Sequence, residues 1–138
     1  MAFLWIHESP PAWDAGKARV IGAAPDGVFT IDRREGAVLS GDWWRVEDGG
    51  ETIGYGQMDN NWGDAEVLLA VDPSRQKGGV GTFILDRLEE EASARGINYL
   101  YNVVPQSHPD RDGLTRWLQR RGFTASKDDG LLRRSVRR

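Results

Sequence analysis

The join between an apolar strand and a helix, at residues 71–82, constrains the fold of this chain more than any other feature of its sequence. Residues 65–71 form an apolar run of strand length, which stops at Asp72-Pro73. Beyond the join, apolar residues recur at every fourth position, as on one face of a helix: Val80, Ile84, Leu88 and Ala92. Three glycines fall at the join itself: Gly78, Gly79 and Gly81. The pattern predicts a buried strand that leads, through glycines, into a long helix.

A glycine-rich helix start favours an anionic ligand. The first turn of a helix has backbone N–H groups without partners and carries the positive end of the helix dipole, so it can hold a pyrophosphate where no side chain blocks the approach. Arg75 and Lys77 add positive charge beside the glycines. The segment has neither the Gly-Lys-Ser/Thr order of a P-loop nor the G-x-G-x-x-G spacing of a dinucleotide-binding fingerprint. Two alternatives remain: another kind of phosphate-binding loop, or a helix start that binds nothing.

The rest of the chain alternates between strand and helix patterns. In order, we expect a strand (3–7), a helix (11–24), a hairpin (43–47 and 51–56), a strand (65–71), a helix that starts within the glycine cluster and stops at Arg95-Gly96, a strand (97–104), a helix (110–121) and a return strand from Phe123 with a turn at 128–130. In the 11–24 helix, one stripe at helical spacing is expected to face the core: Trp13, Lys17, Val20, Ile21 and Ala24. This alternation places the chain in the mixed α/β class. Residues 25–41 mix turn-forming and apolar residues, allow no assignment and are a candidate substrate-facing loop.

Length and composition narrow the function classes. With 138 residues, of which 39% are hydrophobic and 28% charged, the chain fits one globular domain over residues 1–138. It has no cysteine and two histidines, so we expect no disulfide, no thiolate nucleophile and no metal site. The net charge of −3 argues against nucleic-acid binding, and no apolar run reaches the length of a membrane span or a signal peptide. We therefore expect a cytoplasmic protein that binds neither nucleic acid nor membrane.

The glycine segment matches one further phosphate-binding pattern, Q/R-x-x-G-x-G/A, through Gln76, Gly79 and Gly81. With a buried strand before it and a long helix after it, the segment resembles that of the GNAT N-acetyltransferase superfamily. The hairpin at 43–55 and the helix that ends in Gly122-Phe123 are also similar to this family. The resemblance implies a central mixed sheet of six to seven strands flanked by helices, with two central strands that splay apart.

The resemblance also implies acetyl-CoA as co-substrate and assigns its binding residues. Backbone N–H groups of the helix start would hold the pyrophosphate: Gln76, Lys77, Gly78, Gly79, Val80, Gly81 and Thr82. The pantetheine arm would lie along Leu69, Ala70 and Val71, in the opening left where residues 99–104 splay away. The Leu69 N–H would stabilise the oxyanion of the reaction.

The catalytic residues are less well defined. Glu66 is the candidate general base, because some family members place theirs on this strand; the alternative is a solvent-facing residue or a structural ion pair. Leu118 stands where family members often carry a tyrosine acid, and Arg111 where they often carry an asparagine. Tyr101, His108 or water could supply the proton instead.

Three functions are compatible with these patterns: an acetyltransferase, an acyl-CoA-binding module without catalysis, and an interaction domain that keeps only the fold. The acceptor of a transferase could be a small-molecule amine or a protein amine. Trp43 and Trp44 must face opposite sides of a strand, so one is expected in the core, and the other either lines a pocket or packs against a helix or a second subunit of a homodimer.

Overall fold

The computed structural model describes residues 3–22, 34–76, 78–104, 108, 110–125 and 131–136. Its elements are β1 (Leu4–Glu8), α1 (Ala15–Val20), β2 (Asp42–Asp48), β3 (Glu51–Asn61), β4 (Asp64–Val71), the 3₁₀ turn η1 (Pro73–Arg75), α2 (Val80–Ala94), β5 (Tyr99–Val103), α3 (Arg111–Arg120), β6 (Thr124–Ala125) and β7 (Leu131–Ser135). Seven strands form one sheet in the order β1-β2-β3-β4-β5-β7-β6. Neighbouring strands are antiparallel except β4 and β5, which are parallel. The predicted mixed α/β class and strand number are confirmed.

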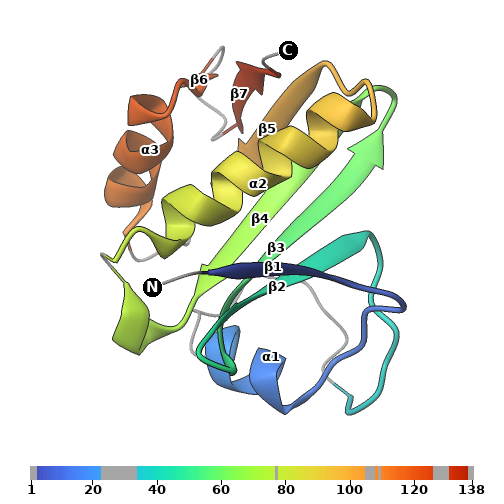
Figure 1. Cartoon of the computed structure of the whole chain (residues 1–138). Helices are drawn as coiled ribbons and strands as arrows, with labels where there is room; N and C mark the ends of the chain where they lie inside the picture. The colour runs from blue at the N-terminus through green and yellow to red at the C-terminus, as the bar shows by residue number, and fades with distance from the viewer. Residues whose placement is uncertain are drawn as a thin grey trace.

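The two faces of the sheet carry separate apolar clusters. Figure 1 shows α2 running across the sheet with α3 beside it, while α1 lies apart from both, against the strands of the N-terminal half. The larger cluster joins α2 and α3 to one face of the sheet, and its members include Trp44, Val67, Ile84, Leu88, Leu100 and Leu118. The smaller cluster joins α1 to the opposite face through Trp13, Val20, Ile21, Leu39, Trp43, Tyr55 and Ala70. Trp43 and Trp44 therefore face opposite ways, as expected, and both are buried.

A glycine in β3 lets α2 lie close to the sheet. A Cβ atom at Gly56 would stand 2.9 Å from side-chain atoms of both Ile84 and Trp5, closer than real Cβ contacts allow. Gly56 pairs with Leu69 of β4. The close approach therefore fixes α2 directly over the part of β4 that carries the predicted cofactor site.

Three elements differ from the sequence expectation. Strand β3 continues to Asn61 rather than ending at Gly56. Helix α1 begins at Ala15 rather than near Pro11, because the Asp14 carboxylate caps it by accepting a hydrogen bond from the Lys17 N–H (2.9 Å). The return strand is divided into β6 and β7, which pair with each other. The expected turn at 128–130, Ala24 and most of the unassigned 25–41 segment lie outside the described residues. In the part of the chain that the structure describes, no helix is long and apolar enough to cross a membrane.

Candidate active site

The central strands β4 and β5 separate, as the sequence predicted. They pair at only three positions, and the last pair is Glu66 with Tyr101. Strand β4 continues to Val71 and keeps its pairing with β3 as far as Gly54. Among the described residues, the edge of β4 that faces β5 therefore has no strand partner beyond Glu66.

Asn102 spans the point where the two strands part. Its Nδ2 donates a hydrogen bond to the Val67 carbonyl oxygen at 2.8 Å, and the residue is 7% exposed. This side chain takes the place of the backbone donor that a continued ladder would have supplied. Sequence reasoning did not single out Asn102, although a carboxamide inside a strand that is otherwise largely apolar and aromatic is a signal of such a role.

The backbone of Leu69 and Val71 faces this opening. Along a strand, alternate residues direct their N–H and C=O to the same neighbour. The Asp72 N–H donates to the Ile53 carbonyl (2.8 Å) on the β3 side, whereas the Val67 carbonyl meets Asn102 on the β5 side. Leu69 and Val71 share the orientation of Val67, and Ala70 directs its backbone groups toward β3. Two of the three residues expected along the pantetheine therefore direct toward it backbone groups that have no strand partner in the described part of the chain.

The turn from β4 into α2 is fixed by Asp72. Its carboxylate accepts hydrogen bonds from the Ser74 N–H (2.9 Å) and hydroxyl (2.8 Å), and it pairs with Arg19. These contacts, led by the bond from the Ser74 N–H, lower the pKa of the Asp72 carboxyl. An ionised and anchored Asp72 sets the direction in which the chain leaves the sheet.

Helix α2 begins without a side-chain cap. Its N-cap residue, Gly79, has φ of +83°, a conformation that residues with a side chain rarely adopt. No side chain of the described residues caps the N–H groups of the first turn, which include those of Val80, Gly81 and Thr82. Gly81 has a different role from Gly79: it leaves room for Trp117, because a Cβ at position 81 would lie 3.2 Å from the Trp117 ring. The predicted anion site thus has the expected uncapped helix start.

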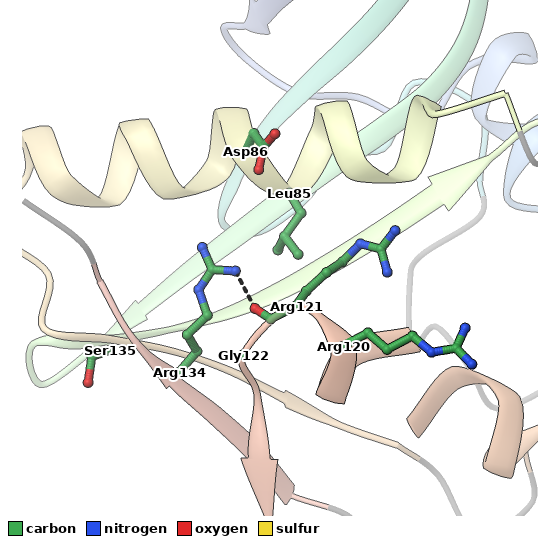
Figure 2. A pocket seen from close by; sticks show the side chains of 7 residues that line it. All are labelled: Leu85, Asp86, Arg120, Arg121, Gly122, Arg134 and Ser135. Atoms are coloured by element: carbon green, nitrogen blue, oxygen red, sulfur yellow. Dashed lines mark hydrogen bonds between the residues drawn. The ribbon is translucent and has the colours of Figure 1, made fainter. Parts of the chain in front are cut away.

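Of the two cations expected beside this helix start, Arg75 is already paired. It forms an ion pair with the largely buried carboxylate of Asp48, and Lys77 lies outside the described residues. Arg121, which no sequence pattern singled out, reaches α2 from the end of α3 (Figure 2). Its Nη2 donates to the Thr82 hydroxyl at 2.8 Å, and its guanidinium lies 3.9 Å from the centre of the Trp117 ring. Burial lowers the pKa of Arg121.

Glu66 lies on β4 between two strands. Its neighbours in register are Asp59 on β3 and Tyr101 on β5, at the last pair before the opening. Burial, and then the negative charge of Asp59, raise the pKa of Glu66. Glu66 forms no ion pair among the described residues. In that part of the chain, the alternative role as a member of a structural ion pair therefore lacks a cationic partner.

Leu118, at the position of the family's tyrosine acid, and the candidate proton donors His108 and Tyr101 have different surroundings. Leu118 is fully buried in the larger apolar cluster. The His108 ring is engaged locally, since its Nδ1 accepts a hydrogen bond from the Asp110 N–H (2.9 Å) just before α3. Tyr101, beside Glu66, is the one candidate hydroxyl that the register brings next to the strand opening among the residues described. No group of three or more His, Cys, Asp or Glu side chains in those residues could hold a metal ion.

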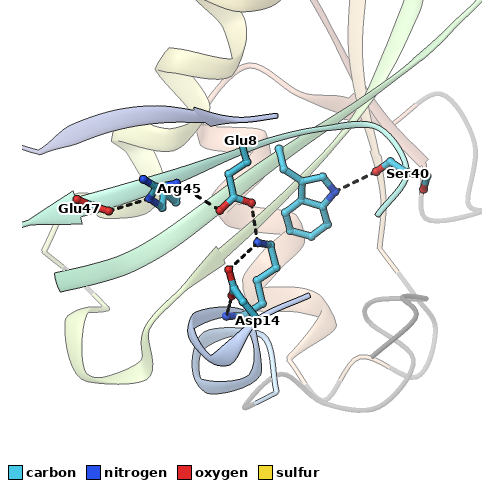
Figure 3. Close-up of polar contacts among 7 residues, drawn as sticks. Glu8, Asp14, Ser40, Arg45 and Glu47 are labelled. Atoms are coloured by element: carbon cyan, nitrogen blue, oxygen red, sulfur yellow. Dashed lines mark hydrogen bonds and ion pairs between the residues drawn. The ribbon is translucent and has the colours of Figure 1, made fainter. Parts of the chain in front are cut away.

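A buried ion network lies on the opposite face of the sheet (Figure 3). The Lys17 ammonium is fully buried, lies 2.6 Å from Glu8 Oε1 and 3.4 Å from Asp14 Oδ2, and sits 4.8 Å from the centre of the Tyr55 ring. Arg45 approaches the other Glu8 oxygen at 3.6 Å. These contacts tie α1 to β1 and to the strands beneath it. Sequence analysis placed Lys17 on the core-facing stripe of the helix without predicting its partners.

Comparisons with solved structures identify related folds. The chain superposes on the ribosomal-protein-S18-alanine N-acetyltransferase from Escherichia coli with a TM-score of 0.66 and 16% identity, over 98% of this chain and 96% of that one. It superposes on N-acetylglutamate synthase from Neisseria gonorrhoeae, complexed with coenzyme A and N-acetyl-glutamate, with a TM-score of 0.73 and 17% identity, over 98% of this chain but 36% of that one. For the PaiA N-acetyltransferase from Thermoplasma acidophilum, in complex with coenzyme A, the TM-score is 0.57 and the identity 16%, over 67% and 59% of the two chains. At these identities the likeness concerns the fold.

The sequence comparisons give the family. No curated protein matches the chain. A family model described as "Acetyltransferase (GNAT) family" matches residues 5–123. The predicted resemblance is confirmed, and the chain belongs to the GNAT acetyltransferase family.

Proposed function

We propose that this protein is an N-acetyltransferase that moves an acetyl group from acetyl-CoA to a primary amine by direct attack on the thioester. One observation carries the proposal: the pairing of β4 and β5 stops at Glu66, and the backbone of Leu69 and Val71 then faces an opening beside the uncapped start of α2. An extended pantetheine arm can add to this free edge like a short strand, while the helix start holds the pyrophosphate. Two of the solved relatives contain coenzyme A.

The binding residues proposed for acetyl-CoA remain those of the sequence analysis. The N–H groups from Gln76 to Thr82, including that of Lys77, receive the pyrophosphate, and Leu69 and Val71 pair with the pantetheine. The N–H and C=O of Ala70 point to β3, so they do not pair with the pantetheine. Ala70 lies between the two residues that do.

The reaction needs one proton acceptor and one stabilised oxyanion. The amine nitrogen attacks the thioester carbon, a C–N bond forms, and the Leu69 N–H stabilises the oxyanion. Glu66 takes the proton of the amine, directly or through a water molecule, and its raised pKa suits this role near neutral pH. The C–S bond then breaks, and the thiolate takes a proton from water or from the Tyr101 hydroxyl.

The same chemistry specifies only the class of the acetyl acceptor, which is an amine. The solved relatives include enzymes named for a protein alanine and for glutamate, so both a protein amine and a small-molecule amine are compatible with this fold. A single domain, a cytoplasmic location and an ability to form a homodimer remain part of the proposal.

Leu118 favours a second candidate function. It is buried where family members often carry a tyrosine acid, and a leucine cannot donate a proton. A protein that binds acyl-CoA without catalysis would have this feature. In such a protein, Leu118→Tyr could restore a proton donor near the thioester sulfur.

The test is release of free thiol from acetyl-CoA across a panel of amino acids, polyamines and peptides with free amino termini. We expect acceptor-dependent release by the wild type, and a Leu118→Tyr variant that is no faster. A wild type that binds acetyl-CoA but releases no thiol with any amine, beside an active Leu118→Tyr variant, would establish the binding module instead. A wild type that binds no acetyl-CoA would exclude both functions.

A further inference from the structure

A hollow of about 480 Å³ lies between α2, the end of α3 and β7, outside the strand opening (Figure 2). Three arginines line it, Arg120, Arg121 and Arg134, together with one carboxylate, Asp86. We refer to it as the arginine pocket. Its volume falls in the range of ligand sites, and it concentrates positive charge on a chain whose net charge is −3.

The positive charge of the pocket is only partly compensated. Arg134 is paired with Glu89, and its Nη1 donates to the Arg121 carbonyl at 2.6 Å. The Arg121 guanidinium donates to a hydroxyl and to the Trp117 carbonyl, which are neutral acceptors. Neither Arg120 nor Arg121 forms an ion pair within the described residues, and Asp86 is the one carboxylate lining the pocket. Two guanidinium charges thus share a single nearby carboxylate.

The pocket adjoins the predicted pyrophosphate site. Arg121 contacts Thr82, which belongs to the first turn of α2, and the pocket residues Leu85 and Asp86 lie about one helical turn, roughly 5 Å, further along the same helix. Leu85 and Asp86 follow the first helical residue, Val80, by five and six positions, so a group in the pocket would lie roughly 8 to 9 Å along the helix from a pyrophosphate at the helix start. Coenzyme A carries its diphosphate on the 5′ oxygen and a phosphate monoester on the 3′ oxygen of the same ribose, and this places two anions at a comparable separation.

We propose that the arginine pocket binds the 3′-phosphate of the acyl-CoA donor, with Arg121 and Arg120 as its ligands. The inference rests on the proposed function. A phosphate monoester is a dianion with several strong acceptors, and guanidinium groups suit it because they donate two hydrogen bonds in a fixed geometry. Arg121, at the border between the pocket and Thr82, lies near both anionic groups of the donor.

The alternative to phosphate binding is a structural role of the arginines at the end of α3. Basic side chains at the end of a helix interact favourably with its dipole, and Arg121 caps α3 through its bond to the Trp117 carbonyl. If the arginines were purely structural, the protein would bind ligands with and without the 3′-phosphate equally well. If the pocket were a site for free phosphate, it would bind inorganic phosphate, and the protein would again bind both kinds of ligand equally well.

The test compares coenzyme A with dephospho-coenzyme A, which lacks the 3′-phosphate, by titration calorimetry. We expect the wild type to bind coenzyme A about tenfold more tightly, as one charge-assisted contact would give. Arg121→Gln should bring the two affinities within about twofold, even though both fall. Arg120→Gln should reduce part of the preference for coenzyme A. The Arg120 side chain has no hydrogen bond among the described residues, so this change should leave the fold intact. Arg116→Gln, the same change on an exposed residue of α3 outside the pocket, is the matched control and should keep the full preference.

Equal wild-type affinities would overturn the inference and leave the proposed function standing. A wild-type preference that persists in both pocket variants would place the 3′-phosphate elsewhere. Inorganic phosphate should weaken the binding of coenzyme A more than that of dephospho-coenzyme A; binding of phosphate without a preference between the nucleotides would make the pocket a free-phosphate site. Absence of binding by either nucleotide would overturn both proposals.

Discussion

Two carboxylates at the two ends of β4 meet opposite environments. Asp72 accepts hydrogen bonds from Ser74 and pairs with Arg19, and its pKa is lowered. Glu66 is partly buried next to Asp59 with no cation paired to it among the described residues, and its pKa is raised. A lowered pKa keeps a carboxylate charged for structural contacts, whereas a raised pKa suits a group that takes up protons near neutral pH. The anchored Asp72 suits the first role, and Glu66 suits the second.

We predict that Glu66→Gln lowers kcat by about a hundredfold or more, since it removes a base and keeps the shape of the side chain. The Kd for acetyl-CoA should stay nearly unchanged. In the wild type, kcat/KM should rise with pH through the pKa of Glu66, above the ordinary range of a glutamate, because the base acts only when ionised. This rise should disappear in the variant. Stopped assays of thiol release from pH 4 to 9 would measure both effects.

Asp59→Asn provides the matched control for Glu66. Removing the neighbouring negative charge favours the ionised form of Glu66, so the rising limb of the pH profile should move to lower pH. Because the fold raises the Glu66 pKa, the ionised group destabilises the folded state above that pKa, and Glu66→Gln should not lower Tm at pH 8. A near-normal rate at every pH, or a clear loss of Tm, would assign Glu66 to structure.

At the scale of elements, periodicity located the strand and helix around the site but not the point where the strands part. Apolar spacing predicted a strand over residues 65–71 and a helix from the glycine cluster to Arg95, and β4 and α2 occupy nearly these ranges. The end of the β4–β5 pairing depends on a bond between Asn102 and Val67, which are 35 residues apart. The contact of Arg121 with Thr82 is equally long-range, spanning 39 residues. A local sequence pattern can mark Asn102 as unusual in its strand, but it does not identify the partner residue in either pair.

We predict that Asn102→Ala destabilises the protein by about 1 to 3 kcal/mol, because the Val67 carbonyl loses its partner at a buried position. Asn102→Asp should cost more, since an ionised carboxylate would face the carbonyl oxygen without a hydrogen to donate. Urea unfolding at pH 7 would measure both, with the exposed Asn61→Ala as control. We also expect a raised KM for acetyl-CoA in Asn102→Ala, because the width of the opening is no longer fixed. An unchanged unfolding midpoint in both Asn102 variants would mean that the bond does not hold the strands.

At the scale of the whole molecule, the sheet is stabilised differently on its two faces. The face toward α2 is covered by an apolar cluster, which binary patterning revealed. The face toward α1 combines apolar residues with the ion network of Lys17, Glu8 and Asp14. Sequence spacing placed Lys17 on the inner side of its helix, but the choice of Glu8 as partner depends on how β1 and α1 pack. A six-residue helix such as α1 has little stability alone, so its position depends on these tertiary contacts.

The last prediction concerns this ion network. Lys17→Met should destabilise the protein by about 3 to 5 kcal/mol, because Glu8 would keep a buried charge with Arg45, at 3.6 Å, as its one remaining cation among the described residues. Glu8→Gln alone should also destabilise, since the fully buried Lys17 would lose its nearest carboxylate. The double variant should be more stable than the sum of the two losses predicts, because neither charge of the pair then remains buried. Urea unfolding of the four proteins gives the coupling free energy of a double-mutant cycle, expected at about 1 to 3 kcal/mol. Additive losses within about 0.5 kcal/mol would contradict the prediction and show that the 2.6 Å contact between Lys17 and Glu8 does not hold α1 to the sheet.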